Sequence, residues 1–276
     1  MTLPNFLVIG APKAGTTSLH VHLRAHPEVF MPEIKEPRFF GYEGRGGLVK
    51  FPIRTLEEYE ALFADVAGET AIGEATPHYL VYPNAAERIR TLLPHAKLIA
   101  SLRDPVERSY SVYQMNRRNK ELNADVPFLE AIETDHNLRE TYYPMLARYF
   151  QRFPPEQLAV ILLEDLEQSP ATTMRRLYAF LGVDPGFRPD LAKIANPGGE
   201  PRSKLLHRLF SDTRLRGLSR GFPEPLVERL RAARSRNLAK QPLSPADRRK
   251  AIGFFREDIL RTQDLIGRDL SAWLTT

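Results

Sequence analysis

The sequence predicts an α/β fold in which a central parallel β-sheet is flanked by helices. First, short apolar runs alternate along the chain with longer stretches of helical periodicity, which is the pattern of a parallel sheet with helical crossovers. Second, residues 6–19, FLVIGAPKAGTTSL, run from an apolar stretch through a Gly/Pro turn into a helix-like stretch. A strand, a tight loop and a helix N-terminus in this order present backbone N–H groups to a phosphate.

Length and composition describe one folded unit. The chain has 276 residues, of which 42% are hydrophobic and 26% charged, so we expect a single domain over 1–276. It has no cysteine, which excludes disulfides and cysteine-bound metals. No apolar run has the length of a membrane helix, and the first residues lead into a strand without a signal peptide. We therefore expect a cytoplasmic location and no membrane span.

The elements of this fold follow in order along the chain. The first helix is predicted over 16–25, because the residue before Pro27 is driven out of the helical region. The remaining extended segments are predicted at 29–32, 71–74, 97–102 and 158–163. Helices are predicted at 56–66, at 85–93, from 105 past 117, in two segments of 128–153 separated at 142–144, and at 171–181. The part 196–276 is predicted to be mostly helical and basic, with an amphipathic helix at 245–266.

Three polar segments follow predicted strands. They are Lys13–Ser18, Glu74–Tyr79 and Arg103–Ser111. Ligands of parallel sheets bind outside the carboxyl ends of the strands, so we expect these segments to meet at one edge of the sheet.

The loop after the first strand departs from the Walker A pattern of nucleotide triphosphatases. That pattern has Gly, four residues, Gly, Lys and then Ser or Thr. Gly10 and Gly15 have this spacing, but Thr16 stands in place of the lysine, and the loop lysine is Lys13. The strand predicted at 97–102 leads into Arg103, and a basic end suits an anion better than a metal. A P-loop kinase or NTPase and a turn without a ligand remain alternatives at this point.

Four motifs resemble those of sulfotransferases that use 3′-phosphoadenylyl sulfate (PAPS). Residues 10–19 resemble the loop for the 5′-phosphosulfate, and 103–111, RDPVERSYS, resemble the 3′-phosphate motif. Residues 35–40, KEPRFF, and 74–79, EATPHY, are similar to the KEPHFF and EKSPxY segments of the heparan-sulfate and carbohydrate branch. The motifs occur in the family's order over 6–181. The resemblance implies a bacterial-type member with a P-loop NTPase-like three-layer fold.

The resemblance also implies the reaction and the donor site. The expected enzyme transfers a sulfuryl group from PAPS to a hydroxyl or amine of a sugar, lipid or small metabolite, without a metal, and releases adenosine 3′,5′-bisphosphate (PAP). Lys13 would neutralise charge on the bridging oxygen. Arg103 and Ser111 would bind the 3′-phosphate, and Arg202 and Ser203 would make late nucleotide contacts. The 5′-phosphosulfate would be held by backbone N–H groups and hydroxyls of Ala14, Gly15, Thr16, Thr17 and Ser18.

Glu36 is the expected general base that takes the acceptor proton. Arg38 stands where the KEPHFF segment of the heparan-sulfate branch has histidine. An arginine at this position can keep Glu36 ionised and bind an anionic acceptor, but it cannot transfer protons. His78 is therefore a rival candidate for the base. Glu74 would orient a lysine of the site or cap the strand end. The residues assigned to acceptor binding are Lys35, Arg38 and Glu74.

The formal net charge of +5 is unevenly distributed, because arginines are frequent between 202 and 240. These arginines belong either to solvated helix faces or to a surface for an anionic partner. A non-enzymatic polyanion-binding module is thus a further alternative. The sequence has no helix-turn-helix, zinc-finger or RNP pattern, so we expect no nucleic-acid partner. The oligomeric state is left open.

Overall fold

The computed structural model describes residues 2–41, 53–119, 121–123, 125–190 and 242–276, with the backbone of 200–201 and 238–239. Five parallel strands form one sheet in the order β2-β3-β1-β4-β5. Their bounds are β1 Phe6–Gly10, β2 Val29–Phe30, β3 Ala71–Ala75, β4 Lys97–Leu102 and β5 Leu158–Leu162. A separate antiparallel pair is formed by β6 (Glu200–Pro201) and β7 (Leu238–Ala239).

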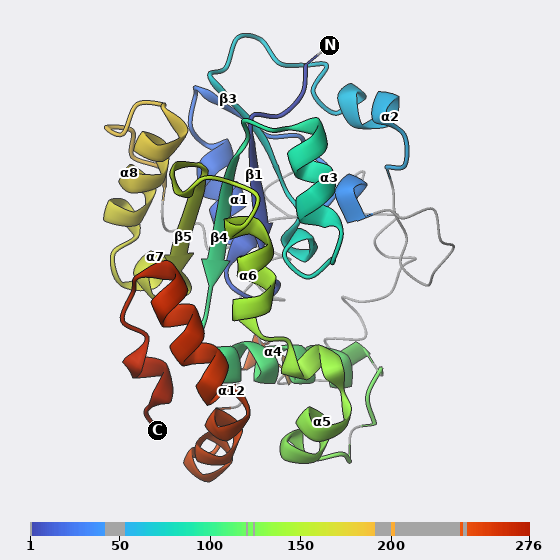
Figure 1. The fold of residues 1–276 in the computed structure, drawn as a ribbon, viewed down its shortest axis with the longest axis vertical. Coiled ribbons are helices and arrows are strands. Elements are labelled where there is room, and N and C mark those ends of the chain that lie inside the picture. Colours follow the sequence, from blue (N-terminus) through green and yellow to red (C-terminus); the bar gives the residue numbers. More distant parts are fainter. Residues whose placement is uncertain are drawn as a thin grey trace.

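Helices lie on both faces of the sheet and beyond the carboxyl ends of its strands (Figure 1). Their bounds are α1 Thr16–Arg24, α2 Leu56–Ala61, α3 Ala85–Leu92, α4 Pro105–Asn119, α5 Phe128–Thr134, α6 Tyr142–Phe150, α7 Leu163–Gln168, α8 Pro170–Leu181 and α12 Pro245–Ile266. Short 3-10 turns occur at Phe39–Gly41, Pro77–Tyr79, His136–Arg139, Pro155–Gln157 and Ser271–Leu274. None of the described helices has the length and apolar character needed to cross a membrane.

The two faces of the sheet bury two hydrophobic clusters. In β1, Phe6 and Val8 pack into a cluster with α1 and α8, whereas Leu7 and Ile9 pack into a cluster with α3 and α6. Successive side chains of a strand point to opposite faces, so a continuous apolar run is what a strand covered on both faces requires. The predicted three-layer α/β arrangement with a central parallel sheet is confirmed.

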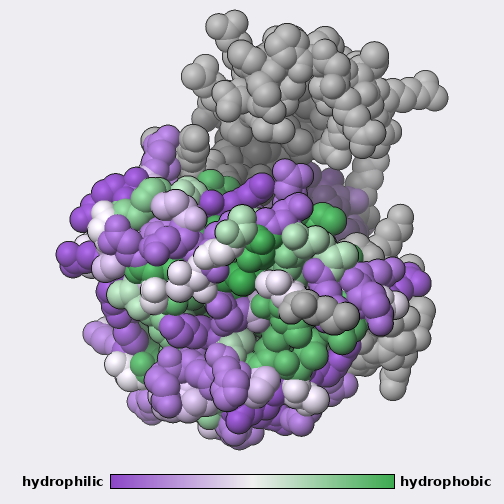
Figure 2. Space-filling model, turned by 90° about the horizontal axis from the view of Figure 1, so that it is seen from above, coloured by the Kyte–Doolittle hydropathy of each residue, from purple (hydrophilic) through white to green (hydrophobic). Residues whose placement is uncertain are grey.

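Among the residues coloured by hydropathy in Figure 2, hydrophilic ones predominate on the face shown, with hydrophobic patches between them. Within the described ranges, the large hydrophobic side chains that are exposed are Ile34, Leu56 and Leu260.

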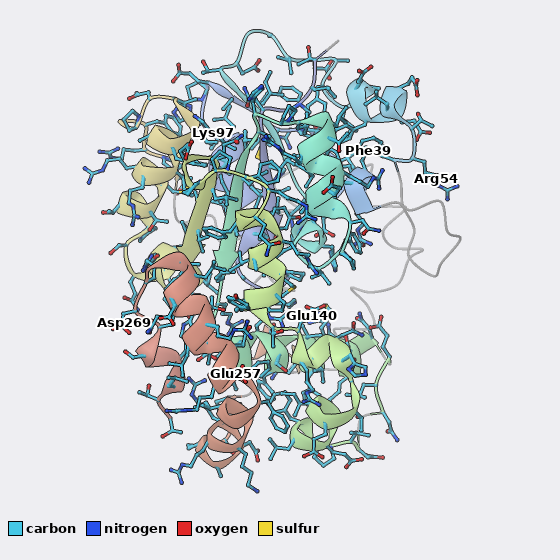
Figure 3. All side chains as sticks on the ribbon, in the orientation of Figure 1. Phe39, Arg54, Lys97, Glu140, Glu257 and Asp269 are labelled. Carbon is cyan, nitrogen blue, oxygen red and sulfur yellow. The ribbon has the colours of Figure 1, made fainter. Side chains whose placement is uncertain are left out.

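Helix α4 is fixed to the start of α6 by a buried arginine. The Arg108 side chain is 0% exposed, and its guanidinium donates to a Glu140 carboxylate oxygen at 2.7 Å and to the Glu140 carbonyl at 2.6 Å. Glu140 lies at the junction of α6 with the helices beyond the sheet (Figure 3). The guanidinium also lies over the ring of Tyr142, 5.4 Å from its centroid. The segment that carries Arg103 and Ser111 is thereby held in place.

The structure differs from the predicted elements in two places. Residues 142–144 begin α6 instead of separating two helices, because Asp258 accepts the backbone N–H groups of Tyr142 and Tyr143 at 2.8 Å each, and proline is tolerated in a first helical turn. The segment after β5 forms two helices, α7 and α8, where one was predicted. Most of the basic stretch 202–240 lies outside the described residues.

Candidate functional site

The loop between β1 and α1 is held against the neighbouring strand β4. The Ala11 N–H donates to the Ser101 carbonyl at 2.7 Å, and the buried Ser101 hydroxyl donates to the Ala14 carbonyl at 2.6 Å. Gly15 has a φ of 76°, and a Cβ there would lie 2.5 Å from Leu163 Cδ1, so this position requires glycine. Gly15 is the N-cap residue of α1 and makes no side-chain hydrogen bond to its first turn, and the N-terminus of a helix attracts negative charge.

Lys13 lies in this loop among other cations. Its side chain is half-buried, and its ammonium lies 3.9 Å from Met115 Sδ. Burial lowers the pKa of Lys13, and the positive charges of Arg118, Arg103 and Lys35 lower it further. An accumulation of positive charge beside the N-terminus of a helix is the electrostatic environment of an anion-binding site.

Three residues of the site have a backbone conformation that side chains disfavour. Among the described non-glycine residues, positive φ angles occur at Lys13 (67°), Glu36 (61°) and Arg38 (59°). Such a conformation costs roughly 1–3 kcal/mol per residue and concentrates at functional sites. The two loops that carry these residues are therefore held in place by the structure around them.

The loop with Glu36 and Arg38 is bound to the end of β3. The Glu36 N–H donates to the Ala75 carbonyl at 3.1 Å, and the Arg38 N–H donates to the Thr76 hydroxyl at 3.3 Å. Thr76 is joined in turn to β1, because its N–H donates to the Val8 carbonyl at 3.0 Å.

The Glu36 carboxylate is the centre of a cluster of charges. Arg38 donates to Glu36 Oε2 at 2.9 Å, and Lys35 donates to Glu36 Oε1 at 3.4 Å. Lys35 also donates to the Thr17 hydroxyl at 3.0 Å, which connects this cluster to α1. His78 Nδ1 lies 3.7 Å from Glu36 Oε2.

The environment sets the charges of Glu36 and His78. Burial alone would raise the pKa of Glu36, but the hydrogen bond from Arg38 and the charges of Lys35, His78 and Arg38 outweigh it and hold the pKa below its usual value. Burial lowers the pKa of His78, although the charge of Glu36 opposes this. At neutral pH, an ionised carboxylate and a neutral imidazole therefore face each other, and each is able to accept a proton.

Glu74 lies in β3, next to the loop that carries Glu36 and Arg38. Its side chain is fully buried and accepts hydrogen bonds from the hydroxyls of Thr76 at 2.9 Å and Tyr59 at 3.4 Å. Burial raises the pKa of Glu74 to about 7. The Thr76 hydroxyl also accepts the Arg38 N–H, so Glu74 is connected through Thr76 to the loop that carries Glu36 and Arg38. These hydrogen bonds are not contacts with a lysine of the site, which was one of the predicted roles of Glu74.

The buried Glu74 carboxyl should make folding stability depend on pH. Between its ordinary pKa of 4.5 and about 7, the folded state keeps a proton that the unfolded state has lost. Stability should therefore fall as pH rises through this range, by on the order of 3 kcal/mol. Glu74→Gln should remove this loss and be more stable than the wild type at pH 8, as measured by urea unfolding at pH 5 and pH 8. The exposed-carboxylate control Glu33→Gln should follow the wild type, and a Glu74→Gln protein less stable than the wild type at pH 8 would contradict the prediction.

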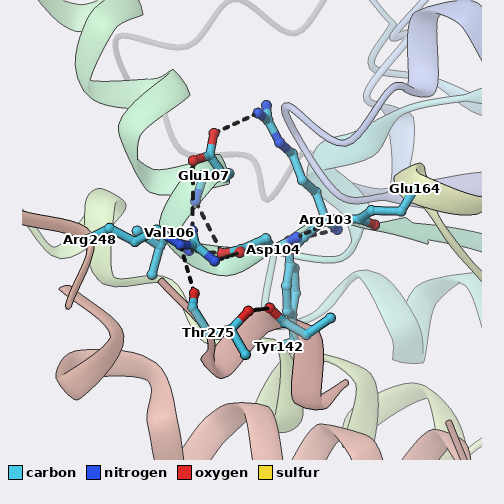
Figure 4. Close-up of polar contacts among 9 residues, drawn as sticks. Arg103, Asp104, Val106, Glu107, Tyr142, Glu164, Arg248 and Thr275 are labelled. Atoms are coloured by element: carbon cyan, nitrogen blue, oxygen red, sulfur yellow. Dashed lines mark hydrogen bonds and ion pairs between the residues drawn. The ribbon is translucent and has the colours of Figure 1, made fainter. Parts of the chain in front are cut away.

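Arg103 begins the turn between β4 and α4 (Figure 4). Its N–H donates to the Tyr142 hydroxyl oxygen at 3.3 Å, and that hydroxyl donates to the Arg103 carbonyl at 2.8 Å. The Arg103 guanidinium pairs with Glu107 at 3.1 Å. Ser111 lies half-buried two turns into α4. The carboxyl ends of β1, β3 and β4 thus carry the three predicted segments, as expected.

Some parts of the site were not foreseen in the sequence. Ser101 anchors the loop between β1 and α1, Arg118 acts on Lys13 through its charge, and Arg248 contacts the Arg103 turn from a distant helix. Of these, Ser101 carried a signal, because it is a polar residue inside an apolar strand. The predicted nucleotide contacts Arg202 and Ser203 lie outside the described residues. Within the described part of the chain, no group of three or more His, Cys, Asp or Glu side chains is arranged to hold a metal ion.

Known proteins resemble this chain in sequence. The sequence model of the sulfotransferase domain family matches residues 3–196. The membrane-associated sulfotransferase kil1 of Dictyostelium discoideum is 38% identical over 157 residues, covering 55% of this chain and 32% of that protein. A mouse bifunctional heparan sulfate N-deacetylase/N-sulfotransferase 4 is 31% identical over 216 residues, covering 71% of this chain and 24% of that protein. The chain thus spans a third or less of the length of these two relatives.

Solved structures resemble it as well. A sulfotransferase from Alicyclobacillus acidocaldarius has a TM-score of 0.75 and 29% identity, and the match covers 99% of each chain. A mouse sulfotransferase complexed with PAP has a TM-score of 0.55 and 16% identity, covering 96% of this chain and 86% of that one, which is a likeness of fold alone. The predicted P-loop NTPase-like fold is confirmed.

Proposed function

The chain belongs to the sulfotransferase family, and from this premise we propose that it transfers a sulfuryl group from PAPS to an acceptor hydroxyl or amine. The observation that carries the proposal is the meeting of Lys13, other cations and the N-terminus of α1 at the carboxyl end of β1. This arrangement fits a donor with several negative charges.

In the proposed donor site, the backbone N–H groups from Ala14 to Ser18 and the hydroxyls of Thr16 and Thr17 bind the 5′-phosphosulfate. Arg103 and Ser111 bind the 3′-phosphate, for which the planar guanidinium is well suited. Lys13 donates to the oxygen that bridges sulfur and phosphorus. Its contact strengthens as the negative charge on that oxygen grows.

On the acceptor side, Glu36 takes the proton of the attacking hydroxyl or amine. The new bond forms between the acceptor atom and sulfur, the bond from sulfur to the bridging oxygen breaks, and PAP leaves with the electron pair. The pairs with Arg38 and Lys35 keep Glu36 ionised and ready to accept the proton. His78 is the rival base, because its Nδ1 is buried without a hydrogen-bond partner among the described residues.

The acceptor is proposed to be a carbohydrate or another small hydroxyl or amine compound. A sugar acceptor is supported by relatives named for heparan sulfate and carbohydrate, among them a rat carbohydrate sulfotransferase 15 that is 28% identical over 249 residues. Lys35 and Arg38 lie beside Glu36 and are proposed to bind anionic groups of this acceptor. A screen of acceptors with ³⁵S-labelled PAPS would identify the compound.

The donor assignment is tested by the binding of PAP. At a hundredfold excess over its Kd, PAP should raise the free energy of unfolding by about 3 kcal/mol, which is readily seen as a thermal shift. Adenosine 5′-monophosphate, which lacks the 3′-phosphate, should shift the midpoint much less at the same concentration. Arg103→Ala should lose most of the difference between the two ligands. A protein whose melting is insensitive to PAP would overturn the proposed function.

A further inference from the structure

Helix α12 lies beyond the segment 3–196 that matches the sulfotransferase domain. It nevertheless packs against α4 and α6, and it places one arginine on the turn that carries Arg103 (Figure 4). That residue is Arg248, which is 144 positions away in sequence from its partner Asp104.

Arg248 is held by three different groups. It donates to Asp104 Oδ2 at 2.5 Å and, through Nε, to the Thr275 carbonyl at 2.9 Å. A third nitrogen lies 3.7 Å from Glu107 Oε1. The Arg248 side chain is 17% exposed and the Asp104 side chain 8%, so water screens this pair only weakly. Arg248 is thus in a fixed position between two carboxylates of the same turn.

Asp104 transmits this contact to α4. Its other oxygen, Oδ1, accepts the N–H groups of Val106 at 2.9 Å and Glu107 at 3.3 Å, and so caps the helix. The side chain that anchors Arg248 therefore also fixes the direction in which α4 leaves the Arg103 turn.

Glu107 creates an electrostatic conflict for the 3′-phosphate. Arg103, which is proposed to bind that phosphate, is paired with Glu107 at 3.1 Å. The pair has a spacing of four residues, and pairs of this kind are weak when exposed to water; Glu107 is 38% exposed. A phosphate can therefore displace Glu107 from Arg103, but the Glu107 carboxylate, once released from Arg103, would repel the phosphate. Arg103 pairs with Glu107 Oε2, and Arg248 lies near the other oxygen of this carboxylate, Oε1.

We propose that Arg248 is a positioning residue for the donor: it fixes the Arg103 turn through Asp104 and takes over the charge of Glu107 when Arg103 turns to the 3′-phosphate. The proposal rests on PAPS being the donor, as proposed above. It assigns a part of the donor site to the chain that follows the family domain.

The test compares two ligands that differ only in the 3′-phosphate. Arg248→Ala should weaken PAP binding about tenfold, within the range of coupling between contacting charged groups, and leave the Kd of adenosine 5′-monophosphate within about twofold. Combining it with Glu107→Gln should restore most of the PAP affinity, because the repelling charge is then gone. A residue with a merely structural role would change both affinities together and would not be rescued in this way.

Arg268→Ala is the matched control. Arg268 lies just beyond the other end of α12 and pairs with Asp165 through two hydrogen bonds of 2.8 and 3.0 Å, so its loss also removes an arginine–aspartate contact. It should leave the preference for PAP over adenosine 5′-monophosphate unchanged. Should Arg248→Ala fail to fold, Arg248→Gln carries the test, because the amide keeps a hydrogen-bond donor near Asp104 but removes the charge that faces Glu107; it should weaken PAP binding several-fold and leave the Kd of adenosine 5′-monophosphate unchanged.

The outcomes separate the two proposals. A wild-type protein that does not bind PAP would overturn the donor assignment itself. A wild-type protein that prefers PAP, with the same preference in Arg248→Ala, or in Arg248→Gln where Arg248→Ala does not fold, would overturn the role of Arg248 alone.

Discussion

Replacing Lys13 by alanine is expected to lower kcat by about two to three orders of magnitude while changing the Kd of PAP only a few fold. The ammonium is proposed to contact the bridging oxygen, whose charge grows as the bond to sulfur breaks, so the contact is worth more in the transition state than in the ground state. Single-turnover transfer from labelled PAPS gives the rate, and calorimetric titration with PAP gives the affinity.

The backbone at Lys13 requires a control, because alanine at a φ of 67° is strained. Lys13→Gly removes the same ammonium without this strain, so equal losses of kcat in both variants assign the effect to the charge. Lys35→Ala removes a neighbouring ammonium that contacts Thr17 and Glu36 and should reduce kcat far less. A Lys13→Ala protein whose affinity for PAP falls as much as its rate would show that Lys13 only binds the donor.

Glu36→Gln should reduce transfer by about two to four orders of magnitude, the usual contribution of a general base, without loss of PAP binding. The amide keeps the size of the side chain but cannot accept the acceptor proton. Steady-state rates with a saturating acceptor, together with a thermal shift by PAP, measure both properties. His78→Gln is the matched variant at the rival position and should retain most of the activity.

The pH dependence distinguishes the two candidate bases. Because the pKa of Glu36 is held below its usual 4.5, a profile of kcat/KM governed by Glu36 should fall to half of its plateau only below that value. Burial lowers the pKa of His78 from its usual 6.5, and the charge of Glu36 opposes this lowering. Activity governed by His78 should therefore begin to decline at a higher pH than activity governed by Glu36. An active Glu36→Gln enzyme that loses activity on His78→Gln would assign the base to His78.

The central part of the fold could be predicted from local sequence patterns. The strands β1 and β5 are continuous apolar runs, and β4 is apolar apart from Lys97 and Ser101. A parallel sheet covered on both faces favours this pattern. The loop between β1 and α1 was equally predictable, because the sequence marks it with Gly10 and Gly15, and Gly15 adopts a backbone conformation that needs glycine. The start of α6 was missed, because its cap comes from Asp258, a residue more than a hundred positions later.

The candidate site was predictable as a set of segments and not as a set of contacts. The rule that ligands bind at the carboxyl ends of parallel strands brought Lys13, Glu74 and Arg103 to one edge. It did not predict that Glu74 would be fully buried and hydrogen-bonded to the hydroxyl groups of Thr76 and Tyr59. Nor did it predict the hydrogen bond from Arg248 to Asp104. These contacts depend on tertiary packing between segments far apart in sequence, which no local pattern encodes.

The strand order has a consequence for how such an enzyme diversifies. The order β2-β3-β1-β4-β5 places β1 between two neighbourhoods: the Arg103 turn follows β4 on one side, and Glu36 and His78 follow β2 and β3 on the other. On the proposed assignment, the acceptor side of the site therefore lies on one side of β1 and the 3′-phosphate side on the other. Changes in the loops after β2 and β3 would then alter the acceptor while leaving the proposed donor contacts after β4 in place.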